Sequence, residues 1–182
     1  MLETIGFLEL SSIARGVEAA DAILKAAEVR LIFSKAICPG KYIVMFTGEV
    51  AAVTSSLEAG AARAENTVVD SVVIPRIHPQ VVEAINAATE PGDVGAVGVM
   101  EFYSITAAVY AADAAVKAAE VELIEVRLGS GIGGKSFVTL TGDVAAVGEA
   151  VKAGVAAGTQ RGLLVGDVVI PNPRREIFES LL

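Results

Sequence analysis

The segment Ala-Asp-Ala-Ile-Leu-Lys-Ala-Ala-Glu-Val at residues 20–29 returns as Ala-Asp-Ala-Ala-Val-Lys-Ala-Ala-Glu-Val at residues 112–121. The two segments are 92 positions apart in a chain of 182 residues. Self-similarity at a fixed period is the sequence signature of repeated structural units. The pair therefore predicts two copies of one domain in tandem.

The repeat extends outward from these segments in both directions. The matching pairs are Gly6-Phe7-Leu8-Glu9 with Gly98-Val99-Met100-Glu101 at an offset of 92, Gly40-Lys41 with Gly134-Lys135 at 94, and Ile74-Pro75 with Ile170-Pro171 at 96. The second copy thus carries two short insertions, the first of them near Cys38. We expect domains at residues 1–90 and 94–182, joined by the turn-rich linker Thr89-Glu90-Pro91-Gly92-Asp93.

Each copy has the pattern of a small α+β domain. In the first copy the expected order is strand 5–10, helix from an N-cap at Ser11 or Ser12 to about 27, strands 29–35 and 41–46, helix 49–64, strand 71–74 ended by Pro75, and tail helix 81–87. The order βαββαβ predicts two tandem ferredoxin-like domains. Such a sheet carries helices on one face, so we expect a partner domain or subunit to cover the other.

The first helix shows an apolar stripe with helical spacing. Its members are Ile13, Val17, Ala20, Leu24 and Ala27. Apolar residues that recur at intervals of three and four predict the face of a helix that packs on the core.

Composition excludes several classes of protein. The net charge of −8 argues against nucleic acid, which requires a Lys/Arg footprint, and against an anionic membrane surface. No stretch approaches the roughly 18 apolar residues of a membrane span. Met1-Leu2-Glu3-Thr4 lacks the basic start of a secretory signal, and one cysteine allows no internal disulfide, so we expect a cytoplasmic location.

The segment Gly129-Ser130-Gly131-Ile132-Gly133-Gly134-Lys135-Ser136 satisfies the Walker A pattern. That motif needs a helix after the loop, because the helix N-terminus holds the phosphate. Here the β-rich segment 136–141 follows, and it aligns with the third strand of the first copy. We therefore interpret the loop as a glycine turn between two strands, able to meet small anions or polar solutes.

Catalytic constellations are not evident in the sequence. His78, the single histidine, is expected in a loop, and nothing brings it to a nucleophile. Glu9 and Glu101 repeat at strand ends, which is typical of a structural role. We predict that the chain is not an enzyme.

Cys38 lies in Ile37-Cys38-Pro39-Gly40, a tight turn between two strands where burial in the core is not expected. The residues alone favour a plain exposed thiol. The alternative is a site shared by three chains, since symmetry brings three thiolates to one axis. Iron–sulfur clusters normally take four thiolates, so one iron would be left to water or another ligand.

Two acid–base pairs recur at helical spacing, Asp21 with Lys25 and Asp113 with Lys117. One interpretation is an intrahelical ion pair worth a few tenths of a kcal/mol. The other is a lateral contact in which the lysine lies against a neighbouring particle.

Four segments together resemble the shell proteins of bacterial microcompartments. They are Glu-Ala-Ala-Asp-Ala-Ile-Leu-Lys-Ala-Ala at 18–27, Ala-Ala-Asp-Ala-Ala-Val-Lys-Ala-Ala at 111–119, Thr-Gly-Asp-Val-Ala-Ala-Val at 141–147 and Val-Ile-Pro-Arg at 73–76. The resemblance covers almost the whole chain. It implies the tandem class, whose trimers mimic hexamers and tile into a flat shell in the cytoplasm beside other shell proteins.

Two further segments, 34–41 and 131–135, are similar to the iron–sulfur members of propanediol-utilisation compartments. That resemblance implies a central pore and one 4Fe-4S cluster per homotrimer, with three Cys38 ligands. It also implies electron passage across the shell, or cluster supply to enclosed redox enzymes. The implied pore-loop residues are Ile37, Pro39, Gly40, Gly129, Ser130, Gly131, Ile132 and Gly133.

The resemblance also implies contacts at the edge of the tile. These would be made by Lys25, Lys117 and Arg76. Asn172 stands where the second copy should carry the matching arginine, with Arg174 and Arg175 just after it. The second edge contact therefore departs from the family pattern.

Three other hypotheses remain open at this point. The first is a metal-free tile whose pore conducts small polar metabolites. The second, from another class, is a small-molecule-binding regulatory module, since ferredoxin-like repeats also form sensors. The third is a nucleotide-binding enzyme.

Overall fold

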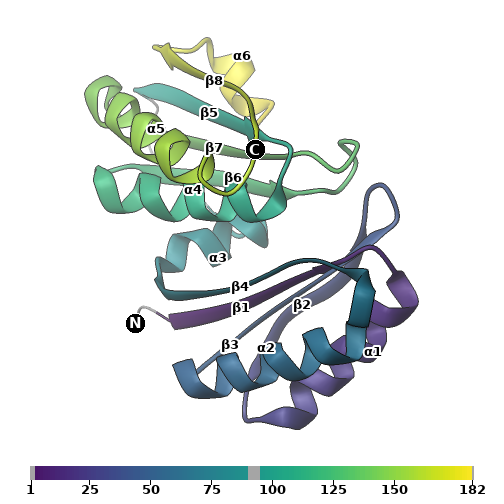
Figure 1. Ribbon diagram of the computed structural model, residues 1–182. Coiled ribbons are helices and arrows are strands. Elements are labelled where there is room, and N and C mark those ends of the chain that lie inside the picture. Colours follow the sequence, from purple (N-terminus) through teal and green to yellow (C-terminus); the bar gives the residue numbers. More distant parts are fainter. Residues whose placement is uncertain (1–2, 90–94, 182) are drawn as a thin grey trace. The chain divides into compact units, whose positions relative to one another are not determined.

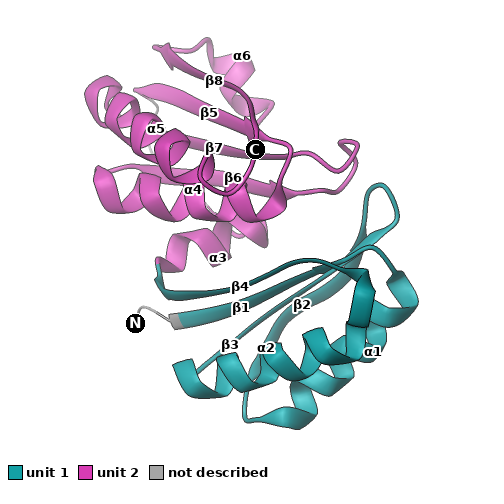
Figure 2. Cartoon of the chain, in the orientation of Figure 1, with its two compact units in different colours: residues 1–77 teal, residues 78–182 magenta. Residues whose placement is uncertain are grey.

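The computed structural model describes residues 3–89 and 95–181 (Figure 1). The chain forms two compact units, residues 1–77 and 78–182 (Figure 2). The predicted domain limits at 90 and 94, and residues 90–93 of the predicted linker, lie outside the described residues. Residues 78–89, which the repeat assigns to the first copy, belong to the second compact unit.

The first unit is a four-stranded antiparallel sheet with two helices. Its elements are β1 (Glu3–Leu10), α1 (Ile13–Ala26), β2 (Arg30–Ile37), β3 (Lys41–Gly48), α2 (Val50–Ala64), the short 3-10 helix η1 (Glu65–Thr67) and β4 (Val68–Ile77). The strand order is β2-β3-β1-β4. This order and the succession βαββαβ confirm the predicted ferredoxin-like fold.

The second unit repeats this arrangement and adds a short helix at each end. Its elements are α3 (Pro79–Ile85), β5 (Ala96–Phe102), α4 (Ile105–Ala118), β6 (Glu122–Leu128), β7 (Ser136–Gly142), α5 (Val144–Gly158), β8 (Leu164–Pro171) and α6 (Arg175–Glu179). The strand order β6-β7-β5-β8 matches that of the first sheet. Helix α3 packs against β6 and α4.

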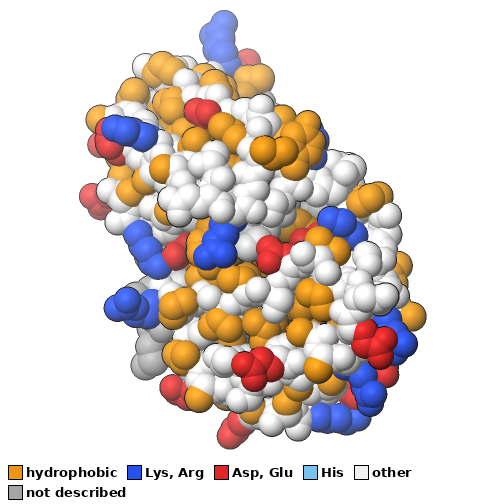
Figure 3. All heavy atoms as spheres, viewed as in Figure 1, with side chains coloured by type: hydrophobic (Ala, Val, Ile, Leu, Met, Phe, Trp, Pro, Cys, Tyr) orange, Lys and Arg blue, Asp and Glu red, His pale blue; other side chains and the backbone are white. Residues whose placement is uncertain are grey.

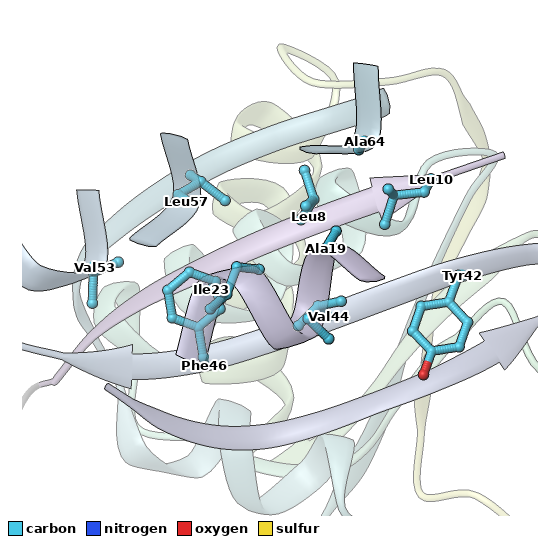
Figure 4. Close-up of a cluster of buried hydrophobic side chains, with 11 residues drawn as sticks. Leu8, Leu10, Ala19, Ile23, Tyr42, Val44, Phe46, Val53, Leu57 and Ala64 are labelled. Atoms are coloured by element: carbon cyan, nitrogen blue, oxygen red, sulfur yellow. The ribbon is translucent and has the colours of Figure 1, made fainter. Parts of the chain in front are cut away.

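The core of the first unit lies between the sheet and helices α1 and α2 (Figure 4). Leu8, Val44 and Phe46 from the sheet meet Ile23 of α1 and Leu57 of α2. Ser12 is the N-cap of α1, and its hydroxyl accepts a hydrogen bond from the Arg15 amide at 3.3 Å. This confirms one of the two N-cap positions predicted from the sequence.

Helix α1 buries a face that includes only Ala20 of the predicted apolar stripe. The buried residues are Gly16, Ala19, Ala20 and Ile23. In the single chain Ile13, Val17 and Leu24 are 45%, 55% and 44% exposed. The cause is close approach, because a Cβ at Gly16 would lie 2.4 Å from the Tyr42 ring. The small residues of α1 form the contact with the sheet, and most of the predicted apolar stripe lies outside the core.

Strand β4 is longer than predicted and runs through Pro75 to Ile77. Proline is tolerated because β4 is an edge strand of its sheet. The pairing with β1 also shifts register between Glu3–Ile77 and Ile5–Ile74, so Pro75 and Arg76 lie in an irregularity of the ladder.

On the face drawn in Figure 3, basic side chains are interspersed with acidic and apolar ones. A nucleic-acid interface instead gathers Lys and Arg into a patch or stripe. Among the described helices, none is long and apolar enough to cross a membrane.

Candidate functional site

The loop between β2 and β3 holds the single cysteine. Cys38 is partly exposed, whereas the preceding Ile37 is buried at 5% exposure. The turn closes with a hydrogen bond from the Gly40 amide to the Ile37 carbonyl at 2.9 Å, and Gly40 has a φ of 97°. The peptide bond between Cys38 and Pro39 is cis. The thiol therefore lies at the tip of a closed turn, as the sequence predicts.

The matching loop in the second unit is longer and built on glycine. The Gly129 amide donates to the Lys135 carbonyl at 3.0 Å, and the Lys135 amide donates to the Ile132 carbonyl at 3.3 Å. Gly129, Gly131, Gly133 and Gly134 all have positive φ, which glycine adopts at little cost. Ser130, Gly131 and Gly133 are exposed.

This loop joins β6 to β7, two antiparallel strands. A Walker A loop places its phosphate at the N-terminus of the helix that follows, and here β7 follows instead. The predicted glycine turn is therefore confirmed, and the resemblance to Walker A is limited to the sequence.

An ion pair supports the base of each loop. Lys41 Nζ lies 2.7 Å from Glu9 Oε1, and the Glu9 side chain is only 4% exposed. In the second unit Lys135 pairs with Glu101 at the matching positions, with both side chains about one third exposed, at 37% and 33%. The hydrogen bond with the Glu101 carboxylate raises the pKa of Lys135 above its ordinary value. The sequence predicted a structural role for the two glutamates but did not identify their lysine partners.

The predicted edge lysines are held by intrahelical ion pairs. Lys25 Nζ lies 2.5 Å from Asp21 Oδ2, and Lys117 Nζ lies 2.5 Å from Asp113 Oδ2. The lysine side chains are 74% and 39% exposed, respectively. The ion-pair interpretation is thus confirmed in both copies, and the lateral contact remains a prediction.

Arg76 and Asn172 occupy matching positions and share a left-handed backbone, with φ of 54° and 46°. Asparagine adopts this conformation more readily than arginine does. Arg76 lines an open pocket of about 860 Å³ in the first unit, together with Glu28, Arg30 and Glu49. The backbone at the two positions is thus conserved between the copies, while the charge is not.

His78 is the N-cap of α3, where its Nδ1 accepts a hydrogen bond from the Gln80 amide at 3.4 Å. The imidazole therefore caps the start of a helix. Within the described parts of the single chain, no group of three or more His, Cys, Asp and Glu side chains is placed to hold a metal ion.

Each of the two ferredoxin-like domains carries a β-hairpin loop with an ion pair at its base. The BMC domain family model matches residues 4–77 and 96–173, one match in each copy. The chain belongs to this family, and it is a structural shell protein of a bacterial microcompartment with tandem BMC domains. Its relatives are shell proteins and not enzymes. The shell-protein assignment is therefore adopted over the hypotheses of a regulatory module and of a nucleotide-binding enzyme.

Three relatives illustrate the similarity. The chain is 43% identical over 182 residues to the bacterial microcompartment shell protein PduT of Citrobacter freundii, covering 100% of this chain and 99% of that protein. A crystal structure of a microcompartments protein from Desulfitobacterium hafniense DCB is 52% identical, with a TM-score of 0.92 over 98% of this chain and 99% of that one. The carboxysome assembly protein CcmO of Synechococcus elongatus is 33% identical over 178 residues, which cover 91% of this chain and 63% of CcmO.

Proposed function

We propose that this chain forms a homotrimeric shell tile with a central pore, in which three Cys38 thiolates bind one 4Fe-4S cluster. The observation that carries the proposal is the position of Cys38, which is partly exposed at the tip of the β2–β3 turn. The loops that would alternate around the pore are this turn and the glycine loop 129–134. The similarity to PduT over the full chain supports the same tile architecture.

The residues of one chain fit a cluster only through symmetry. Each chain has one cysteine, and among its described residues no group of three or more His, Cys, Asp and Glu side chains is placed to hold a metal ion. A threefold axis would supply three equivalent thiolates and leave one iron for water or another ligand. Because the thiol is at a turn tip rather than in the core, it is accessible for such a contact.

A 4Fe-4S cluster supplies reversible one-electron transfer when it is bound. The chain's own contribution would be to hold the thiols in register. Glu9 and Lys41 are suited to this, because their ion pair joins β1 to the first residue of β3, directly after the turn. The role of the tile would be electron passage across the shell or supply of clusters to enclosed redox enzymes.

Lateral contacts with neighbouring tiles would involve Lys25, Lys117 and Arg76. Lys25 is the more exposed of the two edge lysines, and its ion pair with Asp21 orients the side chain. Arg76 is exposed at the end of β4 beside an open pocket. These features support an edge role for the three side chains.

The test is anaerobic reconstitution with iron and sulfide, followed by iron analysis and visible absorption. Wild type should turn brown and hold four irons for every three chains, whereas Cys38→Ala should stay colourless. Ser130→Ala changes the other loop by one atom and is the matched control, which should bind iron as wild type does. Colourless wild type, indistinguishable from Cys38→Ala, would refute the cluster.

A metal-free tile that conducts small polar metabolites is the second candidate, and the glycine loop favours it. Gly131 and Gly133 have open space where a Cβ would project, and Ser130 is exposed. Exposed backbone amides and a hydroxyl suit polar solutes. Iron content separates the two candidates, and Ser130→Trp should slow solute entry into assembled shells if the loop lines the route.

A further inference from the structure

The open pocket of the first unit, with a volume of about 860 Å³, is lined by two arginines and two glutamates. Arg30 is the first residue of β2, and Arg76 lies near the end of β4. Both side chains are exposed. A guanidinium carries five N–H donors, so each arginine can serve a partner in its own chain and also bind a carboxylate of another. We call this site the arginine pocket.

The matching corner of the second unit has the same backbone frame but a different charge. Glu122 is the first residue of β6, as Arg30 is of β2, and Asn172 stands at the position of Arg76 with the same left-handed backbone. The two glutamates of the pocket have acidic counterparts in the second unit. Together with Glu122 these form an exposed acidic corner, made of Glu120, Glu122 and Asp143.

We propose that the arginine pocket of one tile receives the acidic corner of a neighbouring tile, with Glu122 as the carboxylate that meets Arg30 and Arg76. This rests on the proposed shell tile and specifies which of its edges meet. The occupant is a second copy of this chain because the two complementary surfaces belong to the same sequence. Arginine binds a carboxylate through two parallel hydrogen bonds, which gives such a contact a defined geometry.

Contacts between like edges are disfavoured by the same charges. Two acidic corners that faced each other would place Glu122 of one tile against Glu122 of the next, without a cation from either arginine position. Two arginine pockets that faced each other would set guanidinium groups against guanidinium groups. Like charges brought together at an interface cost free energy and reject that pairing, so the repulsion selects unlike edges as much as the attraction does.

The pairing also determines the order of the sheet. In a trimer of two-unit chains, first-unit and second-unit edges alternate around the tile, so opposite edges of a six-sided tile are of different kinds. Tiles related by translation then meet through unlike edges on every side. The inference therefore predicts a sheet in which all tiles share one orientation.

Charge reversal tests the contact. Arg30→Glu alone and Glu122→Arg alone each set like charges against one another, so the protein concentration needed for sheet formation should rise about tenfold or more. Sedimentation and electron microscopy measure that concentration. The double variant Arg30→Glu with Glu122→Arg should restore sheets. Lys152→Glu, the same change of charge at an exposed site on α5, is the matched control and should assemble as wild type does.

Restoration separates the two kinds of pairing, because like-edge contacts in the double variant would still place each edge against its own charge. A double variant that stays a folded trimer but forms no sheets would overturn the pairing, as would single variants that assemble normally. Averaged images of wild-type sheets give an independent readout: one tile orientation supports the inference, and neighbouring tiles in opposite orientations would overturn it. Each of these failures leaves the tile intact, whereas a wild type without sheets overturns both the pairing and the proposed tile.

Discussion

Lys41 Nζ and Glu9 Oε1 lie 2.7 Å apart at the base of the cysteine turn, and the carboxylate side chain is 4% exposed. The same pair recurs in the second unit as Lys135 and Glu101, at a more exposed position. Both pairs join a lysine to a glutamate, but the Glu9 side chain is far more buried than that of Glu101. A comparison of the two pairs therefore isolates the effect of burial on stability.

Lys41→Ala should destabilise the protein by about 2 kcal/mol, because it leaves the Glu9 carboxylate buried without its cation. Lys135→Ala should cost less, since Glu101 is one third exposed and water solvates it. Urea unfolding followed by circular dichroism measures both. Equal losses for the two variants would contradict the importance of burial.

Stability should also fall at alkaline pH through Lys135. Its folded pKa is raised above the ordinary lysine value of 10.5, so the charged lysine stabilises the fold fully below that value. The contribution is lost as pH rises through the higher folded pKa. Thermal unfolding of wild type should therefore lose more stability than Lys135→Met above pH 10.5. If the thermal stabilities of wild type and Lys135→Met fall in parallel as the pH rises, the Lys135 ion pair is not the source of the alkaline loss.

Gly154 of α5 should not tolerate alanine. A Cβ there would lie 2.5 Å from Met100 Sδ and 2.9 Å from the Ala111 carbonyl oxygen, so the substitution overpacks the contact between α5 and α4. We expect a loss of about 1–3 kcal/mol in the free energy of unfolding.

Gly148→Ala in the same helix is the matched control for that substitution. Nothing lies within 4 Å of its Cβ position, and alanine is the better helix former by about 1 kcal/mol. It should therefore stabilise the protein. A stabilising Gly154→Ala would show that α4 and α5 move apart at little cost.

Lys25→Ala should abolish extended sheets in electron micrographs while it leaves the mass of the oligomer unchanged. The reason is its proposed position at the tile edge, 74% exposed in the single chain. Lys152→Ala, at an exposed site on α5, is the control and should still form sheets. If Lys25→Ala still forms normal sheets, Lys25 makes no essential contact at the tile edge.

The repeat around Asp21 and Asp113 was sufficient to predict both ferredoxin-like domains, because periodicity and element order are properties of the sequence. The glycine loop was interpreted correctly because the β-rich residues after Lys135 exclude a following helix. The placement of Cys38 at a turn tip followed from Pro39 and Gly40, which favour a turn.

Other features depend on tertiary contacts that no local pattern reports. The buried face of α1 is set by the close approach of Gly16 to Tyr42, so only Ala20 of the predicted stripe is buried. Pro75 did not end β4, because an edge strand leaves one side of its ladder open. The packing of α3 on β6 depends on Gln80, a residue with no distinctive sequence context.

The separation of the Cys38 sulfur atoms in a crystal structure of the assembled oligomer tests the central claim most directly. The account predicts three Cys38 Sγ atoms converging on one threefold axis, close enough to ligate a single cluster. Cys38 thiols dispersed around the oligomer, each facing away from the axis, would contradict it.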